Sequence, residues 1–216
     1  MIVYVNGDSH SYGSDAGGPQ VSYGKHLADK LKAEFVCQAT PGGSNSRILR
    51  TTREYLKTNT PDCIVIGWTT WEREEWLYNN RYYCVNGSGH NNLPQALQQQ
   101  YKNWVISKDH NSLADELSAH EEIWALHLEL TEKKIPHLFF NCYLYFQNID
   151  TFKEPKFDWG SNYLDPYGAN TYWNYLNSQG FKSNKWYHFG ADAHQSWAEY
   201  LYPYLTKIIN ESIITK

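Results

Sequence analysis

The sequence predicts a single α/β domain, built as a three-layer α/β/α sandwich around a mainly parallel central sheet. Strand-like and helix-like segments alternate along the chain, an order that places helices on both faces of a parallel sheet. The segment 63–67 is apolar throughout, as expected of a central strand covered on both faces. The length of 216 residues suits one buried core.

The first half of the chain predicts three strands and two helices. An opening β-rich run stops at the turn Asn6-Gly7-Asp8. Leu27 and Leu31 lie four residues apart, on one face of a helix. The predicted elements are strands over 2–5, 34–38 and 63–67 and helices over 23–33 and 46–57.

The second half predicts a long helix, a fourth strand and a terminal helix. Leu117, Trp124 and Leu128 recur at helical spacing, and Pro136 ends that helix. Pro203 is expected to kink or split the terminal helix. The predicted elements are helices over 112–134 and 191–209 and a strand over 137–140.

Two segments of the single domain 1–216, at 71–111 and 144–186, are rich in aromatic residues. The whole chain has 18 Tyr, 9 Trp and 8 Phe. We expect these segments to be insertions that form the walls of a cleft. Because aromatic faces pack against sugar rings, the composition favours a carbohydrate or another polyhydroxylated ligand.

Charge and cysteine content exclude several kinds of partner. The chain has 19 Lys+Arg against 23 Asp+Glu and no basic run, so no nucleic acid partner is expected. No apolar stretch reaches 18 residues, so no membrane span is expected. The four cysteines have no metal-ligand spacing, and no metal or other cofactor is expected. The chain enters its first strand at once, which indicates no signal peptide and a cytoplasmic or virion-associated protein of unknown oligomeric state.

The tripeptide Gly7-Asp8-Ser9 follows the first strand directly and places a hydroxyl at the carboxyl end of the sheet. A serine there is a candidate nucleophile when a base and backbone N–H donors lie nearby. Asp8 is a supporting residue in this hypothesis. The other interpretation is that Asp8 or Ser9 simply caps a helix.

Two further turns offer hydrogen-bond donors to a developing oxyanion. Gly43 lies in the turn after the second strand, where its N–H can approach a substrate oxygen, and Asn45 adds a side-chain donor. After the third strand, Thr69 or Thr70 offers a hydroxyl. Arg73 is expected to pair with a neighbouring glutamate or to contact substrate.

Histidines near the end of the chain are candidates for the base. His188 precedes the terminal helix, His194 lies in its first turn, and Asp192 stands close to its start, where a carboxylate favours the helix dipole. A lone histidine is more often structural than catalytic. The order of an early serine and a late histidine is what favours catalysis.

Taken together, these four blocks resemble those of the SGNH (GDSL-type) hydrolase superfamily, and especially small members common in phage and marine bacterial genomes. The resemblance spans nearly the whole chain and implies a flavodoxin-like fold. It also implies that Ser9 is the nucleophile. The implied oxyanion donors are the N–H groups of Ser9 and Gly43 and the side chain of Thr69, which follows the third strand. The six-residue spacing between histidines maps His188 onto the catalytic base.

The sequence departs from the family pattern at two positions. Thr69 stands where the family usually has an asparagine, and Lys185 stands where it has the aspartate that orients the base. Three substitutes for that aspartate are open. A main-chain carbonyl orients His188, a carboxylate such as Asp158 or Asp165 reaches it, or the working pair is Asp192 and His194.

These observations predict a serine esterase or deacetylase that removes O-acyl groups from a small-molecule or polysaccharide ester. The expected substrate contacts are His10, Trp68, Trp71, Arg73, Tyr143 and Trp186. The alternative is a catalytically impaired scaffold that acts as a carbohydrate-binding or assembly module. A metal-dependent phosphoesterase using Asp8 and histidines is less favoured, because no clustered ligand spacing appears.

Overall fold

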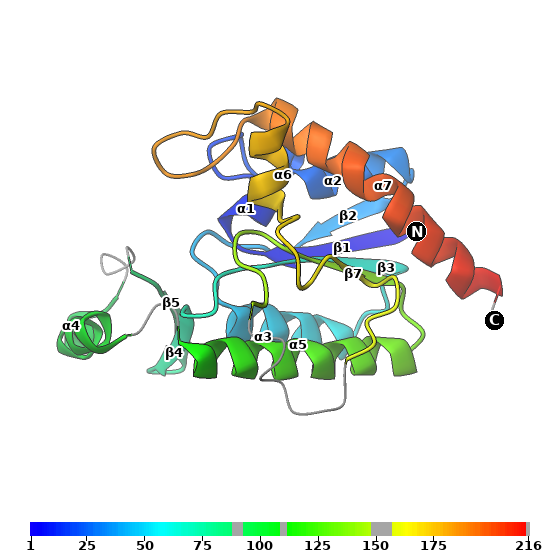
Figure 1. The fold of residues 1–216 in the computed structure, drawn as a ribbon. Coiled ribbons are helices and arrows are strands. Elements are labelled where there is room, and N and C mark those ends of the chain that lie inside the picture. The colour runs from blue at the N-terminus through cyan, green and yellow to red at the C-terminus, as the bar shows by residue number, and fades with distance from the viewer. Residues whose placement is uncertain (88–92, 109–111, 148–156, 215–216) are drawn as a thin grey trace.

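The fold is a five-stranded parallel sheet between two layers of helices (Figure 1), as seen in a computed structural model that describes residues 1–87, 93–108, 112–147 and 157–214. This confirms the predicted fold class. The sheet has the order β2-β1-β3-β6-β7. Its strands are β1 (Ile2–Gly7), β2 (Glu34–Cys37), β3 (Cys63–Trp68), β6 (His137–Asn141) and β7 (Tyr163–Leu164).

Helices cover both faces of this sheet (Figure 1). On one face lie α2 (Tyr23–Lys30), α6 (Tyr172–Ser178) and α7 (Ala191–Ile214), and on the other lie α3 (Asn45–Leu56) and α5 (Leu113–Glu132). Every residue of β3 is buried, because apolar side chains from both helical layers pack against it. The continuous apolar run that predicted a central strand is confirmed.

All strand pairs in the sheet are parallel, so their carboxyl ends meet at one edge. β1 lies between β2 and β3, and the chain crosses from one side of β1 to the other through α3. Such a change of direction leaves a crevice at the carboxyl ends of the strands, where ligands bind in open α/β sheets. The segments after β1, β2 and β3 therefore converge at this crevice.

Glycines at the ends of two strands leave room for α1 to pack closely against this edge of the sheet. Gly7 and Gly67 are paired at the ends of β1 and β3, and the short helix α1 (Ser9–Tyr12) folds back over them. A Cβ added at Gly67 would lie 2.7 Å from Ser11 Oγ and 2.9 Å from Cys142 Sγ. A side chain here would push α1 away from the strand ends, and with it the serine that α1 carries.

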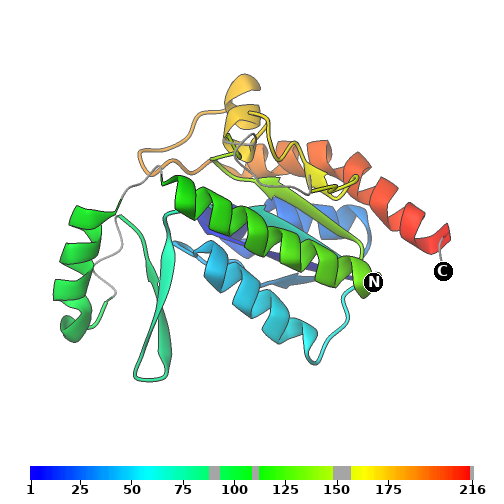
Figure 2. The same cartoon turned by 60° about the horizontal axis from the view of Figure 1, so that its bottom comes forward.

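The described residues of the segment predicted as the first insertion, 71–87 and 93–108, form a projecting unit at the same end of the sheet (Figures 1 and 2). It contains a hairpin of β4 (Glu74–Tyr78) and β5 (Arg81–Val85), a turn η3 (Gln95–Leu97) and the helix α4 (Gln98–Ser107). The unit has its own aromatic cluster, which includes Tyr101 and Trp104. Arg50 of α3 holds it to the body through two hydrogen bonds to Glu75, of 2.7 and 2.8 Å.

Helix α7 runs unbroken through Pro203, so the expectation that this proline splits the helix is wrong. Leu201, Leu205 and Ile208 are buried in the core on either side of it. Their packing in the core stabilises the helix on both sides of Pro203 despite the missing N–H. A short 3-10 helix, η1 (Pro19–Val21), lies between α1 and α2.

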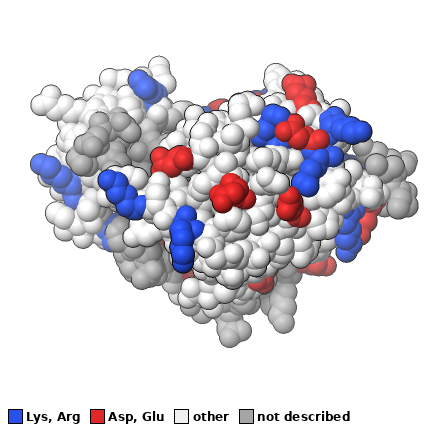
Figure 3. All heavy atoms as spheres, turned by 90° about the horizontal axis from the view of Figure 1, so that it is seen from above, with Lys and Arg blue, Asp and Glu red and all other residues white. Residues whose placement is uncertain are grey.

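No helix within the described ranges is long and apolar enough to cross a membrane. On the face seen in Figure 3, acidic and basic side chains are interspersed, and neither sign forms a continuous patch there.

Candidate active site

A cleft of about 920 Å³ opens at the carboxyl edge of the sheet. Six of the residues predicted for the site line it, and they come from segments far apart in the sequence. They are Ser9, His10, Arg73, Tyr143, Trp186 and His188. The fold therefore brings the early serine and the late histidine to one cavity.

Ser9 is the first residue of α1, with Asp8 as the N-cap. One carboxylate oxygen of Asp8 accepts the His10 N–H at 2.9 Å, which starts the helix. The capping interpretation thus holds for Asp8, while the Ser9 hydroxyl bonds to no other described side chain or backbone group and faces the cleft. Because the first N–H groups of a helix have no partner within it, the Ser9 N–H remains a donor at this position.

A carboxylate that was not predicted from the sequence orients His188. Nδ1 of His188 lies 2.7 Å from Oδ2 of Asp15, a residue in the loop after α1. Asn184 donates from Nδ2 to the same oxygen at 2.8 Å and accepts the His188 N–H at 3.1 Å. Hydrogen bonds from His188 and Asn184 lower the pKa of Asp15, so it is ionised when the imidazole binds it.

This contact fixes the tautomer of the imidazole. A proton on Nδ1 is donated to Asp15, which leaves Nε2 to act as a base. Nε2 of His188 bonds to no other described residue, and the side chain lines the cleft that holds Ser9. No hydrogen bond joins Ser9 to His188 within the described structure; such bonds are often long before substrate is present.

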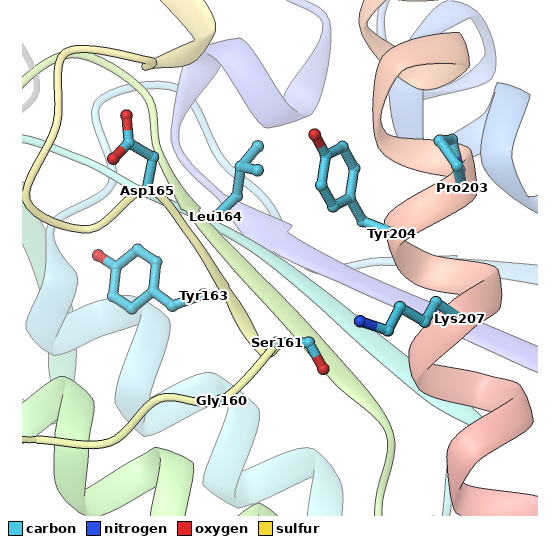
Figure 4. Close-up of a pocket in the computed structure, with 8 residues that line it drawn as sticks. All are labelled: Gly160, Ser161, Tyr163, Leu164, Asp165, Pro203, Tyr204 and Lys207. Carbon is cyan, nitrogen blue, oxygen red and sulfur yellow. The ribbon is translucent and has the colours of Figure 1, made fainter.

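The other acids considered for this role lie elsewhere. Asp158 accepts the Gly160 N–H at 3.0 Å, and Asp165 accepts the Asn170 N–H at 3.1 Å. Figure 4 shows Asp165 beside β7, at a separate cavity of about 650 Å³ that faces α7. Neither carboxylate reaches His188, and the expectation that one of them orients it is wrong.

Asp192 and His194 do not form a working pair. Asp192 accepts the Ala193 N–H at 2.9 Å. His194 is buried, with Nδ1 accepting the Tyr23 N–H at 3.3 Å and Nε2 lying 3.5 Å from the Tyr172 hydroxyl. Burial lowers the pKa of His194 to about 3. It is a neutral core residue that ties α7 to α2.

The predicted oxyanion donors are mostly engaged within the protein. The Gly43 N–H donates to Thr40 O at 3.0 Å. The Asn45 amide donates to Thr69 O at 3.2 Å and accepts the Thr69 N–H at 3.0 Å. The Thr69 hydroxyl donates to Asp8 at 2.8 Å. The Asn45 amide keeps a second N–H, but Asn45, Gly43 and Thr69 do not line the cleft. Of the predicted set, the Ser9 N–H is therefore the donor left to face an oxyanion in the cleft, which corrects the expectation for the other three.

Arg73 pairs with Asp8 and not with a neighbouring glutamate. Its Nη1 lies 3.0 Å from Asp8 Oδ2. Burial raises the pKa of Asp8, but Arg73, the Thr69 hydroxyl and the hydrogen bond from the His10 N–H outweigh it, and the net pKa is below the usual value. A buried carboxylate and a partly exposed guanidinium therefore stand directly beside Ser9.

His10 adds a second imidazole to the cleft. Its ring packs 5.5 Å from that of His188 and 5.6 Å from that of Tyr143, measured between centroids. Burial lowers the pKa of His10 to about 4, and its buried Nδ1 has no partner among the described residues. The ring is neutral and forms part of the wall behind Ser9.

The aromatic contacts divide into two groups. Trp186 and Tyr187 line the cleft and are 62% and 61% exposed. Trp68 is fully buried against Phe139, and Trp71 stacks on Phe146 with ring centroids 4.7 Å apart. Neither of these two tryptophans lines the cleft, so the expectation that they contact substrate is wrong.

In the described part of the chain, no group of three or more histidine, cysteine or acidic side chains is arranged to hold a metal ion. The four cysteines are free thiols, and burial raises the pKa of each.

Comparison with solved structures finds esterases. An acetyl xylan esterase from the rumen bacterium Butyrivibrio proteoclasticus aligns over 97% of this chain and 64% of its own, at 12% identity and a TM-score of 0.53. A psychrotrophic esterase from Pseudoalteromonas sp. aligns over 99% and 97%, at 11% identity and a TM-score of 0.45. A lipolytic protein of the G-D-S-L family from Desulfitobacterium hafniense aligns over 94% and 98%, at 15% identity and a TM-score of 0.39.

The first of these alignments establishes a shared fold, and the present chain spans about two thirds of that esterase, 64% of its length. No protein-family model matches the sequence, and no curated protein matches it.

Proposed function

Given that the chain shares the fold of an acetyl xylan esterase, we propose that it is a serine ester hydrolase of the SGNH type, in which Ser9 is the nucleophile, His188 the base and Asp15 the orienting acid. The observation that carries the proposal is the 2.7 Å contact between His188 Nδ1 and Asp15, at the wall of the cleft into which Ser9 opens. An imidazole held in this way can act as a general base, because its second nitrogen is left free to accept a proton.

The reaction is acyl transfer in two steps. Ser9 Oγ attacks the ester carbonyl while His188 Nε2 takes the hydroxyl proton, and the proton then passes to the leaving alcohol. An acyl-enzyme remains on Ser9. Water attacks it with His188 again acting as base, which releases the carboxylic acid and restores the serine. Asp15 stabilises the imidazolium that forms in each step.

The cleft favours an O-acetylated carbohydrate as substrate. Trp186 and Tyr187 present exposed aromatic faces at the cleft, and Tyr143 lies deeper, stacked on Trp173 with centroids 4.8 Å apart. Aromatic faces of this kind pack against sugar rings while their polar edges stay in water. The acetyl xylan esterase with the same fold supports this substrate class.

Hydrolysis of p-nitrophenyl acetate and of acetylated xylan tests the proposal. We expect turnover of both by the wild type and loss of it in Ser9→Ala. Ser178→Ala is the matched control, because this exposed serine at the end of α6 bonds only its own helix and lies outside the cleft. Equal rates for the wild type and Ser9→Ala would refute the proposal.

A carbohydrate-binding protein without catalysis is the second candidate. It is favoured by the engagement of three predicted oxyanion donors within the protein. A fluorophosphonate probe separates the two candidates, because covalent labelling requires an activated hydroxyl. Binding of acetylated xylan without labelling of Ser9 would favour the second.

A further inference from the structure

A hydrolase of this kind needs donors for the oxyanion that forms when Ser9 attacks, and the described structure leaves few. The Gly43 N–H, the Asn45 amide and the Thr69 hydroxyl each donate to a protein oxygen at 2.8–3.2 Å. Asn45 keeps a second amide N–H but does not line the cleft. Among these groups, the Ser9 N–H would therefore have to carry the charge by itself. A single neutral donor is less than such sites normally provide.

Arg73 lies where a further donor is needed. It stands in the loop between β3 and β4 and lines the same cleft as Ser9. Nη1 donates to Asp8 Oδ2 at 3.0 Å and to Gly43 O at 3.4 Å. Asp8 is directly before the nucleophile, and Gly43 is the residue whose N–H was expected to serve the oxyanion. The guanidinium thus lies between two segments that border the reacting carbonyl.

The remaining donors of Arg73 are available. A guanidinium carries five N–H donors, and those on Nε and Nη2 bond to no other described residue. The side chain is 20% exposed, so it reaches the cleft while much of its charge is screened from water. A charged donor in such a place stabilises an anion more strongly than a neutral one.

We propose that Arg73 is a catalytic residue that donates hydrogen bonds from its free guanidinium N–H groups to the oxyanion, a role that rests on the proposed hydrolase function. Asp8 is then a positioning residue, because its carboxylate holds Nη1 and so sets the plane of the guanidinium. Thr69 positions Asp8 through its hydroxyl. The replacement of the usual asparagine by Thr69 is explained by this chain of contacts, in which Arg73 supplies the donor that the asparagine would have supplied.

Steady-state kinetics on p-nitrophenyl acetate test this role. For Arg73→Gln we expect kcat to fall by roughly 10²- to 10³-fold while KM stays within about threefold, because the contact forms in the transition state. Arg73→Lys keeps the charge but loses the planar set of donors, and we expect an intermediate loss. Arg53→Gln is the matched control, since Arg53 bonds Glu129 on the far helical layer and lies outside the cleft.

Chemical rescue separates catalysis from support of the fold. We expect methylguanidinium added to Arg73→Ala to restore part of kcat, whereas ethylammonium restores less. If Arg73→Gln fails to fold because Asp8 is left unpaired, the double variant Asp8→Asn/Arg73→Gln removes both charges. We expect it to fold and to show at least the loss of kcat expected for Arg73→Gln.

Two results would overturn the role of Arg73. One is a kcat for folded Arg73→Gln within about threefold of the wild type. The other is a loss that appears only in KM and is not rescued. Either result leaves the hydrolase proposal intact as long as turnover depends on Ser9, whereas absence of Ser9-dependent turnover in the wild type would remove both proposals.

Discussion

Mild acid is expected to destabilise this protein through four buried histidines. His10, His120, His137 and His194 are each no more than 4% exposed. Burial lowers the pKa of His10 and His120 to about 4 and that of His137 and His194 to about 3. In the unfolded chain each pKa returns to about 6.5.

The sign follows from which state binds more protons. Between pH 6.5 and about 4 the unfolded chain binds protons at these four sites and the folded protein does not. The free energy of unfolding therefore decreases as the pH is lowered through this range. The contribution of each site is about half of 1.4 kcal/mol per pH unit at pH 6.5 and approaches about 1.4 kcal/mol per pH unit well below it. Between pH 7.5 and 5.5 the four together remove about 5 kcal/mol, which is comparable to the whole stability of many domains.

His137 shows why the folded state resists protonation. Its Nδ1 lies 2.8 Å from the carbonyl oxygen of Ile135, which requires a proton there. Its Nε2 lies 2.8 Å from Nδ1 of His127 and accepts a hydrogen bond from it. A second proton on His137 would break that bond and leave a charge in the core.

Urea unfolding at pH 7.5, 6.5 and 5.5 measures the effect. We expect the free energy of unfolding to fall by several kcal/mol over this range, and His194→Gln to reduce the fall between pH 6.5 and 5.5 by roughly 1 kcal/mol. The slope is the test, because the substitution also changes packing at every pH. A free energy of unfolding that stays within 1 kcal/mol between pH 7.5 and 5.5 would refute the reasoning.

Three further predictions concern the site and the core. Asp15→Asn is expected to lower kcat on p-nitrophenyl acetate by up to about 10⁴-fold with little change in KM, because the imidazole keeps its place but the amide no longer holds the tautomer with a free Nε2; an unchanged kcat would exclude Asp15 from the reaction. Gly67→Ala places a methyl group 2.7 Å from Ser11 Oγ, and a loss of about 1–3 kcal/mol is expected in urea unfolding, where an unchanged midpoint would contradict the tight packing. Leu205→Ala in α7 is expected to cost about 2–5 kcal/mol in the same measurement, and a loss below 1 kcal/mol would show that the helix is not anchored at this point.

The fold could be predicted from the sequence because its signals are local. The apolar run of β3 and the helical spacing of α5 each fix an element without reference to the rest of the chain. The hairpin of β4 and β5 was not predicted, although Asn79 and Asn80 take the left-handed backbone conformation of a tight turn, with φ of 48° and 59°. Charged and aromatic side chains occur on both faces of the hairpin, so its sequence lacks the alternation of polar and apolar residues that predicts a strand.

The site could be predicted only where chain order carried the information. Ser9 and His188 follow from that order, but the acid needs only to lie near His188 in space. Asp15 meets this need from a loop whose backbone is left-handed at that residue, with φ of 61°. Trp68 was misassigned because β3 continues through it, and the alternation of a strand directs its ring into the layer of α3 and α5.

The proposed nucleophile, Ser9, and the proposed orienting acid, Asp15, lie close together in the chain, on one continuous stretch that runs from the end of β1 through α1. That stretch folds against the sheet as a unit, so the spacing between these two groups is set locally. Only the imidazole has to be delivered from afar, by the loop that leads into α7. Small displacements of that one loop should therefore switch off turnover while the tertiary structure stays whole, and inactivation should precede unfolding when the protein is heated.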